Sequence, residues 1–290
     1  MRNNQDASGG DNSTINQAGG DVNLSTTNNY GMGYSEVKDL FMNLFHIHFL
    51  ELGKDVENLI NERAEIAITD YLNRLVAEDP NLIQKTRDPD IRYDIIEVQK
   101  NYARFGDKEM SNLLVDVLVQ RTKEDGSFPK IVLNEALTVI PKLTKIQIDS
   151  LTLLYVIQTI SYINPGNNTI ATFYDTLLAP FLDDKLLPDS EYFYLHLQSC
   201  GCLAILLGSK FGLAEAFHKK FKGKYPDIEA VNQEIRNNPK LDAFEKSWSG
   251  KAMLSRCALS SVGLAIGMTN FNLKTGNTLN MNKFIVDYID

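Results

Sequence analysis

MLSRCALSSVGLAIG at Met253–Gly267, set beside YFYLHLQSCGCLAILL at Tyr192–Leu207, decides the predicted fold. The earlier stretch predicts a helix that stops at Gly201 and is followed by a short apolar strand, because glycine commonly ends helices. The later stretch predicts a returning strand that gives way, at Leu-Ser-x-x-Gly, to a last short helix. The two stretches therefore predict a small strand pair inside a helical chain.

The front of the chain has the period of amphipathic helices. Tyr34–Glu78 carries apolar residues three or four apart, which predicts one long helix, bent at Gly53 and stopped by Asp79-Pro80. Asp88-Pro89 opens a second helix that Gly106 ends, because Asp is a good N-cap and proline suits the first helical turn. Further helices are expected at Asp107–Lys123, Ser127–Ile140, Lys145–Ile163 and Thr172–Leu182, the third of them started by a capping box at Thr144 and Gln147.

The succession of helices 145–163, 172–182 and 192–200, then strand and return strand, resembles a winged helix-turn-helix. A true wing is a short hairpin, whereas here residues 208–250 separate the strands and predict helices at Leu213–Phe221 and Asp227–Arg236. We expect a mainly α fold: a helical N-terminal domain at 34–126, a winged-helix-like domain with a small β element at 127–270, and a C-terminal tail at 271–290.

Composition limits the class of protein. The 290 residues carry a net charge of −8, which argues against a surface built throughout to neutralise phosphate. Three cysteines, an odd number in a chain of this size, suit a reducing compartment. Neither a signal peptide nor an apolar run of membrane-spanning length is present, so we expect a cytoplasmic protein.

Residues 1–33 form a segment rich in Asn, Gly, Ser and Thr that contains a near repeat. GGDNSTINQ at 9–17 returns as GGDVNLSTT at 19–27. Such composition is typical of a flexible tail, but stacked copies could also form ladders of their amides. The repeat resembles the short amyloid-signalling motifs of bacterial immune effectors and their receptors. That resemblance implies self-assembly through Asn12, Ile15, Asn16, Gln17, Val22, Asn23 and Leu24.

Catalytic motifs are missing from the sequence. It contains no phosphate-binding glycine loop, no His-Glu-x-x-His and no Gly-x-Ser-x-Gly. His46 and His48 lie two apart, so on a helix they point in opposite directions and cannot share a metal ion. Cys200 lies four residues after His196 and could be a nucleophile, although a small buried apolar residue is the simpler interpretation. We expect no catalytic residue, no metal and no cofactor, and we favour a protein that is not an enzyme.

The one basic part of the sequence, Lys210–Tyr225, interleaves lysines with aromatic residues. That arrangement suits a nucleic-acid face, through phosphate attraction and base stacking. Lysines also gather at helix C-termini, where they interact favourably with the helix dipole. The candidate nucleic-acid residues are Lys210, Lys219, Lys220, Lys222 and Lys224.

The layout as a whole resembles bacterial defence-associated helical proteins of the abortive-infection type. The resemblance covers roughly Ile91–Asn270 and is carried by the step LQSCGCL at Leu197–Leu203 and the closing LSSVGLAI at Leu259–Ile266. It implies a role in phage defence and supplies no catalytic residue. Our first hypothesis is therefore a non-enzymatic antiviral effector or adaptor that acts through self-association, as a homo-oligomer or with a partner protein of a defence system. The alternatives are a nucleic-acid-binding winged-helix regulator and a membrane-disrupting effector that uses the helix containing Phe41–Phe49; a membrane partner is disfavoured, because that helix lacks a lysine cluster.

Overall fold

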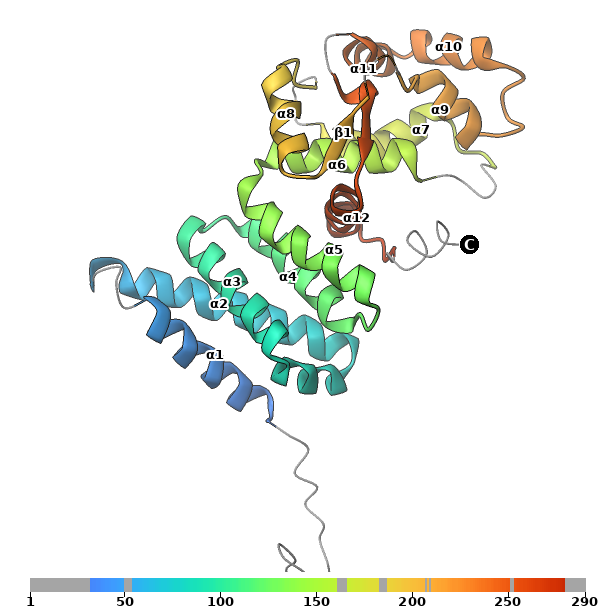
Figure 1. Cartoon of the computed structure of the whole chain (residues 1–290). Helices are drawn as coiled ribbons and strands as arrows, with labels where there is room; N and C mark the ends of the chain where they lie inside the picture. The colour runs from blue at the N-terminus through green and yellow to red at the C-terminus, as the bar shows by residue number, and fades with distance from the viewer. Residues whose placement is uncertain are drawn as a thin grey trace, which may run out of the picture.

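The computed structural model describes residues 32–49, 54–160, 166–182, 187–206, 208, 210–250 and 253–279. Within these ranges the chain is mainly helical and its two strands form a single small sheet (Figure 1). The prediction of a mainly α fold is therefore confirmed. None of the helices in the described ranges has both the length and the apolar character needed to cross a membrane.

The front half consists of stacked helices. After α1 and α2 come a 3-10 helix and the helices α3 to α5, which pack side by side (Figure 1). Their bounds are α1 Tyr34–Phe49, α2 Lys54–Glu78, the 3-10 helix Pro80–Arg87, α3 Pro89–Phe105, α4 Lys108–Lys123 and α5 Ser127–Val139.

The predicted single helix over 34–78 is wrong. Two helices take its place, and α1 packs against α2; the bend predicted at Gly53 lies outside the described residues. Phe41 and Phe45 of α1 are fully buried, and Lys38 Nζ lies 2.6 Å from Glu65 Oε1 of α2. Because α1 folds back on α2, the apolar stripe of each helix is covered by the other. A continuous helix would leave both stripes exposed. The aromatic face that a membrane-disrupting helix would offer to lipid is thus used inside the fold.

Most helix starts are where the local sequence predicts them. The Asp88 side chain accepts from Asp90 N with Pro89 in the first turn, and Gly106 ends α3 in the left-handed region at φ 67°. Asp107 caps α4 by accepting from Met110 N. Thr144 and Gln147 form the predicted reciprocal capping box at the start of α6. Each of these signals acts within one helical turn, so each can be recognised without knowledge of the tertiary fold.

The second half surrounds α6 and α12. The predicted helix at 172–182 is irregular, because it starts as α7 and continues through a π turn into a 3-10 turn. The elements are α6 Lys145–Gln158, α7 Ile170–Phe173, the π turn Tyr174–Leu178, the 3-10 turn Ala179–Phe181, α8 Glu191–Ser199, β1 Leu203–Ile205, α9 Leu213–Lys220, α10 Ile228–Asn237, α11 Pro239–Ser249, the 3-10 turn Met253–Arg256, β2 Cys257–Leu259 and α12 Ser261–Thr275.

The two predicted strands are present and pair antiparallel, with Leu203 opposite Leu259 and Ile205 opposite Cys257. Side-chain amides bond to both outer edges of this pair. Gln198 Oε1 accepts from Ile205 N at 3.0 Å, and Gln158 Nε2 donates to Cys257 O at 2.8 Å. Open strand edges invite pairing with other chains, so these amides make strand addition to the sheet unfavourable.

The segment between the strands carries one helix more than predicted. Helices α9 and α10 match the expected positions, and α11 follows directly, with Asn238 as its N-cap and Pro239 in its first turn. The buried face of α11 includes Leu241, Phe244 and Trp248, whose Nε1 donates to Phe211 O at 2.8 Å. The insertion is therefore a packed helical unit.

The last helix, predicted to be short, has 15 residues and lies at the centre of the fold. It packs on α6, α5 and α4, and it runs across the boundary predicted at residue 270. One continuous cluster of buried apolar side chains extends from Val37 to Phe271, and a small second cluster joins Phe45, Ile60, Ala64 and Ala103. The division into domains at residue 126 stays a prediction.

Two glycines set the position of α12. A Cβ at Gly267 would lie 2.7 Å from Leu151 O of α6, and one at Gly263 would lie 1.9 Å from Cys202 O. Both distances are shorter than a carbon–oxygen contact allows, so only glycine permits this approach.

We expect Gly267→Ala to destabilise the protein by about 1–3 kcal/mol, because the added methyl group forces α12 away from α6. Gly263→Ala should cost at least as much. Gly33→Ala is the control, since a Cβ there meets nothing within 4 Å. Urea unfolding followed by circular dichroism measures all three, and a Gly267→Ala protein as stable as the wild type would contradict the close packing.

Candidate functional site

The lysines predicted to bind nucleic acid do not form one exposed face. Lys220, the last residue of α9, is 3 % exposed. Its Nζ donates to Val156 O at 3.0 Å and to Ile160 O, at the C-terminal end of α6, and lies 5.7 Å from the centre of the Phe173 ring. Lys220 is therefore a buried cap for α6, and its assignment to a nucleic-acid surface is corrected.

Two more of these lysines bond to backbone. Lys224 Nζ donates to Gly166 O and Asn168 O, and Lys210 Nζ donates to Ser249 O at 3.3 Å. Only Lys219 and Lys222 of the predicted set have exposed side chains with no hydrogen bond or ion pair of this kind among the described residues. The predicted self-assembly residues, Asn12, Ile15, Asn16, Gln17, Val22, Asn23 and Leu24, lie outside the described residues.

Burial lowers the pKa of Lys220 to about 7. The neutral amine keeps two N–H groups, which match the two carbonyl oxygens it faces. In the unfolded chain the lysine returns to its ordinary pKa of 10.5. Between these two pKa values the unfolded state binds more protons than the folded state, so stability rises with pH across this window.

A hydrogen-bonded chain of side chains connects the α6 capping box to Cys200. Thr144 N donates to Gln147 Oε1 at 3.0 Å, so the Gln147 amide nitrogen faces His196 Nδ1, at 2.9 Å. Because Nδ1 accepts this bond, we assign the proton of neutral His196 to Nε2, which lies 3.7 Å from Cys200 Sγ. His196 in this form offers the sulfur a donor and cannot take its proton, so the pair lacks the base that a cysteine nucleophile needs.

The three cysteines differ in access to solvent. Cys200 is partly exposed, in contrast to the buried position expected for it, whereas Cys202 and Cys257 are buried. Burial raises the pKa of each of these two thiols to about 12. Thiolate is the reactive form, so the two buried thiols are inert in the folded protein.

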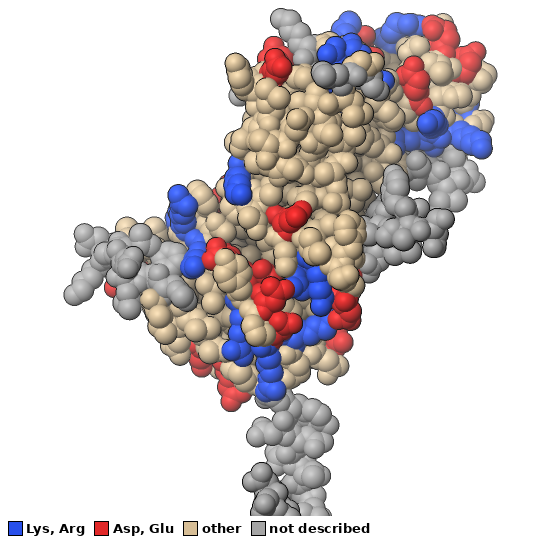
Figure 2. Space-filling view, viewed as in Figure 1, with Lys and Arg blue, Asp and Glu red and all other residues tan. Residues whose placement is uncertain are grey.

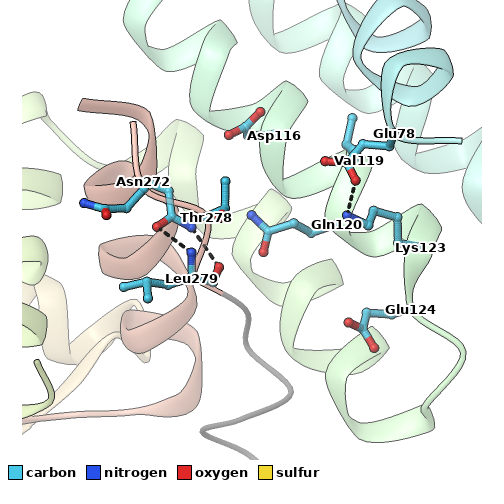
Figure 3. Close-up of a pocket in the computed structure, with 10 residues that line it drawn as sticks. Glu78, Asp116, Val119, Gln120, Lys123, Glu124, Asn272, Thr278 and Leu279 are labelled. Atoms are coloured by element: carbon cyan, nitrogen blue, oxygen red, sulfur yellow. Dashed lines mark hydrogen bonds and ion pairs between the residues drawn. The ribbon is translucent and has the colours of Figure 1, made fainter. Parts of the chain in front are cut away.

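A polar pocket of ≈180 Å³ opens between α4 and the end of α12 (Figure 3). This volume is below the range of about 300–1,000 Å³ typical of small-molecule sites. The pocket is lined by Glu78, Asp116, Val119, Gln120, Lys123, Glu124, Asn272, Asn277, Thr278 and Leu279.

Polar groups of this pocket are bonded to one another or to neighbouring helices. Lys123 Nζ lies 2.5 Å from Glu78 Oε2, and Asp116 Oδ1 accepts from Arg74 Nη1 at 2.7 Å. The Asn272 amide bonds to both N and O of Leu279 (Figure 3). The lining includes no histidine and no cysteine. This arrangement can hydrogen-bond a small polar molecule, but it brings no nucleophile and base together.

An ionic cluster around a buried arginine, which the sequence analysis missed, joins α3, α4 and α5. Arg121 is almost fully buried and contacts Asp90, Asn134 and, at 3.8 Å, Asp94. Burial raises the pKa of Asp94 to about 6, and the Arg121 charge opposes that shift. The sequence does contain a signal for this cluster. Asp94 follows Ile91 by three residues, so a carboxylate lies on the apolar stripe of α3. Among the described residues, no group of three or more His, Cys, Asp or Glu side chains could hold a metal ion.

We expect the stability of the wild type relative to Lys220→Met to increase between pH 7 and pH 9.5, with a slope of at most about 1.4 kcal/mol per pH unit. The physical reason is the proton that Lys220 binds only in the unfolded chain. Lys219→Met, the exposed neighbour, should follow the wild type at every pH. Urea unfolding over this pH range tests the expectation, and parallel profiles for wild type and Lys220→Met would contradict it.

We expect a water-soluble maleimide to label the native protein at Cys200 alone, because the other two thiols are buried and protonated. All three should react once the chain is unfolded. Mass spectrometry counts the adducts, and Cys200→Ser should leave the native protein unlabelled. Rapid labelling of Cys202 or Cys257 in the folded protein would contradict the described burial.

Comparison with known proteins gives a family but no activity. No curated protein and no solved structure matches the chain. A family model matches residues 31–238, more than half of the chain, from just before α1 to the end of α10. Its description, ":-like", states no reaction, ligand or partner. The chain belongs to the protein family that this model represents.

Proposed function

We propose that this protein is a non-enzymatic effector or adaptor of bacterial antiviral defence, of the abortive-infection type, that acts through self-association. The observation that carries the proposal is the position of the two stretches behind the resemblance, Leu197–Leu203 and Leu259–Ile266. They lie side by side as the strand pair and its flanks, where Ser260 N donates to Cys202 O at 3.0 Å and Ser260 Oγ donates to Gly201 O at 2.5 Å. The resemblance thus rests on one structural unit.

The chemistry of the described residues supports a role without turnover. Polar groups of the α4–α12 pocket are bonded to one another or to neighbouring helices, and in the ionic cluster the Arg121 side chain is buried between helices. His196 presents a donor to Cys200 in place of a base. An enzyme active site needs a nucleophile, base or metal beside a space for substrate, and these three places do not combine them.

In this proposal the N-terminal repeat at 9–27 nucleates or transmits assembly, and the helical body is the part that it brings together. Each copy of the repeat joins Gly-Gly-Asp to a run of polar residues, and this composition suits stacking of identical chains, because each Asn or Gln amide can bond to the same residue above and below. The partner is a second copy of the chain or a protein of the same defence system, in the cytoplasm.

A nucleic-acid-binding regulator is the second candidate, favoured by the order of the elements. Helix α6, the segment 170–181, α8, β1 and β2 follow one another as in a winged helix. Against it, the exposed residues of α8 include no lysine or arginine, and three helices separate the strands. An electrophoretic shift that weakens with salt would favour this candidate.

We expect bacteria that express the chain to resist phage infection and the triple variant Ile15→Asp, Val22→Asp, Leu24→Asp to lose that protection, because charges placed on the repeat oppose stacking. The matched control places three aspartates outside the repeat, at Asn4, Ser8 and Asn28. Plaque counts measure protection, and size-exclusion chromatography with light scattering measures assembly. A wild type that gives no protection would contradict the proposed function, and a triple variant that protects and assembles normally would contradict the role of the repeat.

A further inference from the structure

Asp94 is a buried carboxyl group in the front half of the fold. It is 8 % exposed and lies on the apolar stripe of α3, a helix that packs against α2 and α4. Its Oδ2 has no hydrogen-bond partner among the described residues. Burial removes the water that would otherwise solvate the charge, so a carboxylate oxygen without a donor is costly. The fold therefore accommodates the ionised form of Asp94 poorly.

The arginine beside Asp94 is bonded to other partners. Arg121 Nη2 donates to Asp90 Oδ2, and Arg121 Nε donates to Asn134 Oδ1 of α5. The same Nε lies 3.8 Å from Asp94 Oδ2, which is too far for a hydrogen bond. Arg121 thus attracts the Asp94 charge through space but leaves this oxygen without a donor.

Three further carboxylates act on Asp94. Asp90 and Glu97 belong to α3, and Asp88 is the N-cap of that helix. Burial is the largest cause that raises the pKa of Asp94, the three carboxylates raise it further, and the Arg121 charge opposes the shift. The pKa rises from 3.8 to about 6. The unpaired oxygen and the neighbouring charges therefore both favour the neutral form of this carboxyl group.

The other elements around α3 use their charged groups elsewhere. Acidic and basic side chains are interspersed over the front helices (Figure 2). Tyr71 of α2 is near Asp94, but burial raises the pKa of its phenol, whose oxygen lies 2.9 Å from Thr122 Oγ1. Arg63 and Arg92 donate to backbone carbonyl oxygens. Five other cations form ion pairs: Lys38 with Glu65, Arg74 with Asp116, Lys85 with Asp125, Lys100 with Glu97 and Lys123 with Glu78.

We propose that Asp94 is a pH-sensitive switch in the contact between α3 and α4, which is tight when the carboxyl group is protonated and loosens when it ionises. Protonation removes a buried charge that lacks a donor. Ionisation favours outward movement of α3, because the Asp90 side chain, one turn away, is 58 % exposed and water can reach the cluster from that side. This response to pH goes beyond the proposed function and does not depend on it.

The direction of the effect follows from the two pKa values. Between pH 3.8 and about 6 the folded state binds the Asp94 proton and the unfolded state releases it. The contribution of this group to stability is therefore present at low pH and is lost as the pH rises through 6. Relative to a variant without the carboxyl group, the folding equilibrium constant of the wild type should fall about 30-fold between pH 4.5 and pH 7.5.

The test compares the wild type with Asp94→Asn, which keeps the shape of the side chain and removes its ionisation. Urea unfolding at pH 4.5, 6 and 7.5 should show the expected fall. Asp149→Asn is the matched control, because Asp149 is also buried but accepts from both Asn270 and Lys274. Relative to this control the wild type should not lose stability as the pH rises. Parallel profiles for wild type and Asp94→Asn would overturn the inference.

Hydrogen exchange followed by mass spectrometry gives a second measurement that needs only the wild type. After correction for the intrinsic effect of pH on exchange, the amides of α3 should be less protected at pH 7.5 than at pH 5.5. Asp94→Asn should abolish this difference. Protection of α3 in the wild type that is the same at both pH values would also contradict the switch.

Discussion

Gly267 brings α12 so close to α6 that the Leu151 carbonyl takes the place where a methyl group would otherwise lie. Polar side chains also connect α12 to α6. The Asn270 amide donates to Asp149 Oδ1 at 3.0 Å and to Thr152 Oγ1 at 2.8 Å, and Lys274 Nζ lies 2.7 Å from Asp149 Oδ1. Buried polar groups that are all paired fix one register of packing, because any shift would leave them unsatisfied. The contact therefore specifies where α12 lies as well as stabilising it.

The positions of the remaining elements depend on this contact between α6 and α12. Helix α12 also packs on α4 and α5, which connects the front helices to the second half, and Gln120 Nε2 of α4 donates to Thr269 Oγ1 of α12 at 3.1 Å. At the other end of α6, Lys220 caps the last carbonyls and so attaches the insertion to the central helix. The strand pair, bonded at both edges by glutamines, positions α8 beside the start of α6.

The sequence allowed prediction of features that depend on a few neighbouring residues. Caps at Asp88, Asp107 and Thr144 and the two strands were found in this way. Features set by contacts between distant residues were missed: a helical period does not reveal that α1 folds back on α2, and a lysine at a helix end looks the same whether it meets water or, like Lys220, the end of α6. The Asn238-Pro239 pair that starts α11 is a local signal of the same kind. The hydrogen bond between His196 and Gln147 depends on the packing of α8 on α6, whereas the spacing of His196 and Cys200 is visible in the sequence.

Several buried or partly buried polar side chains, among them Lys220, Asn270 and Gln120, bond one helix to another. The close contact between α6 and α12 should make these two helices the most stable part of the protein. Native-state hydrogen exchange followed by mass spectrometry tests it directly, since amides that open only on global unfolding exchange most slowly. We expect the peptides of α6 and α12 to exchange last, after those of α9 to α11. Exchange in α6 or α12 that is faster than in the α9–α11 insertion would contradict it.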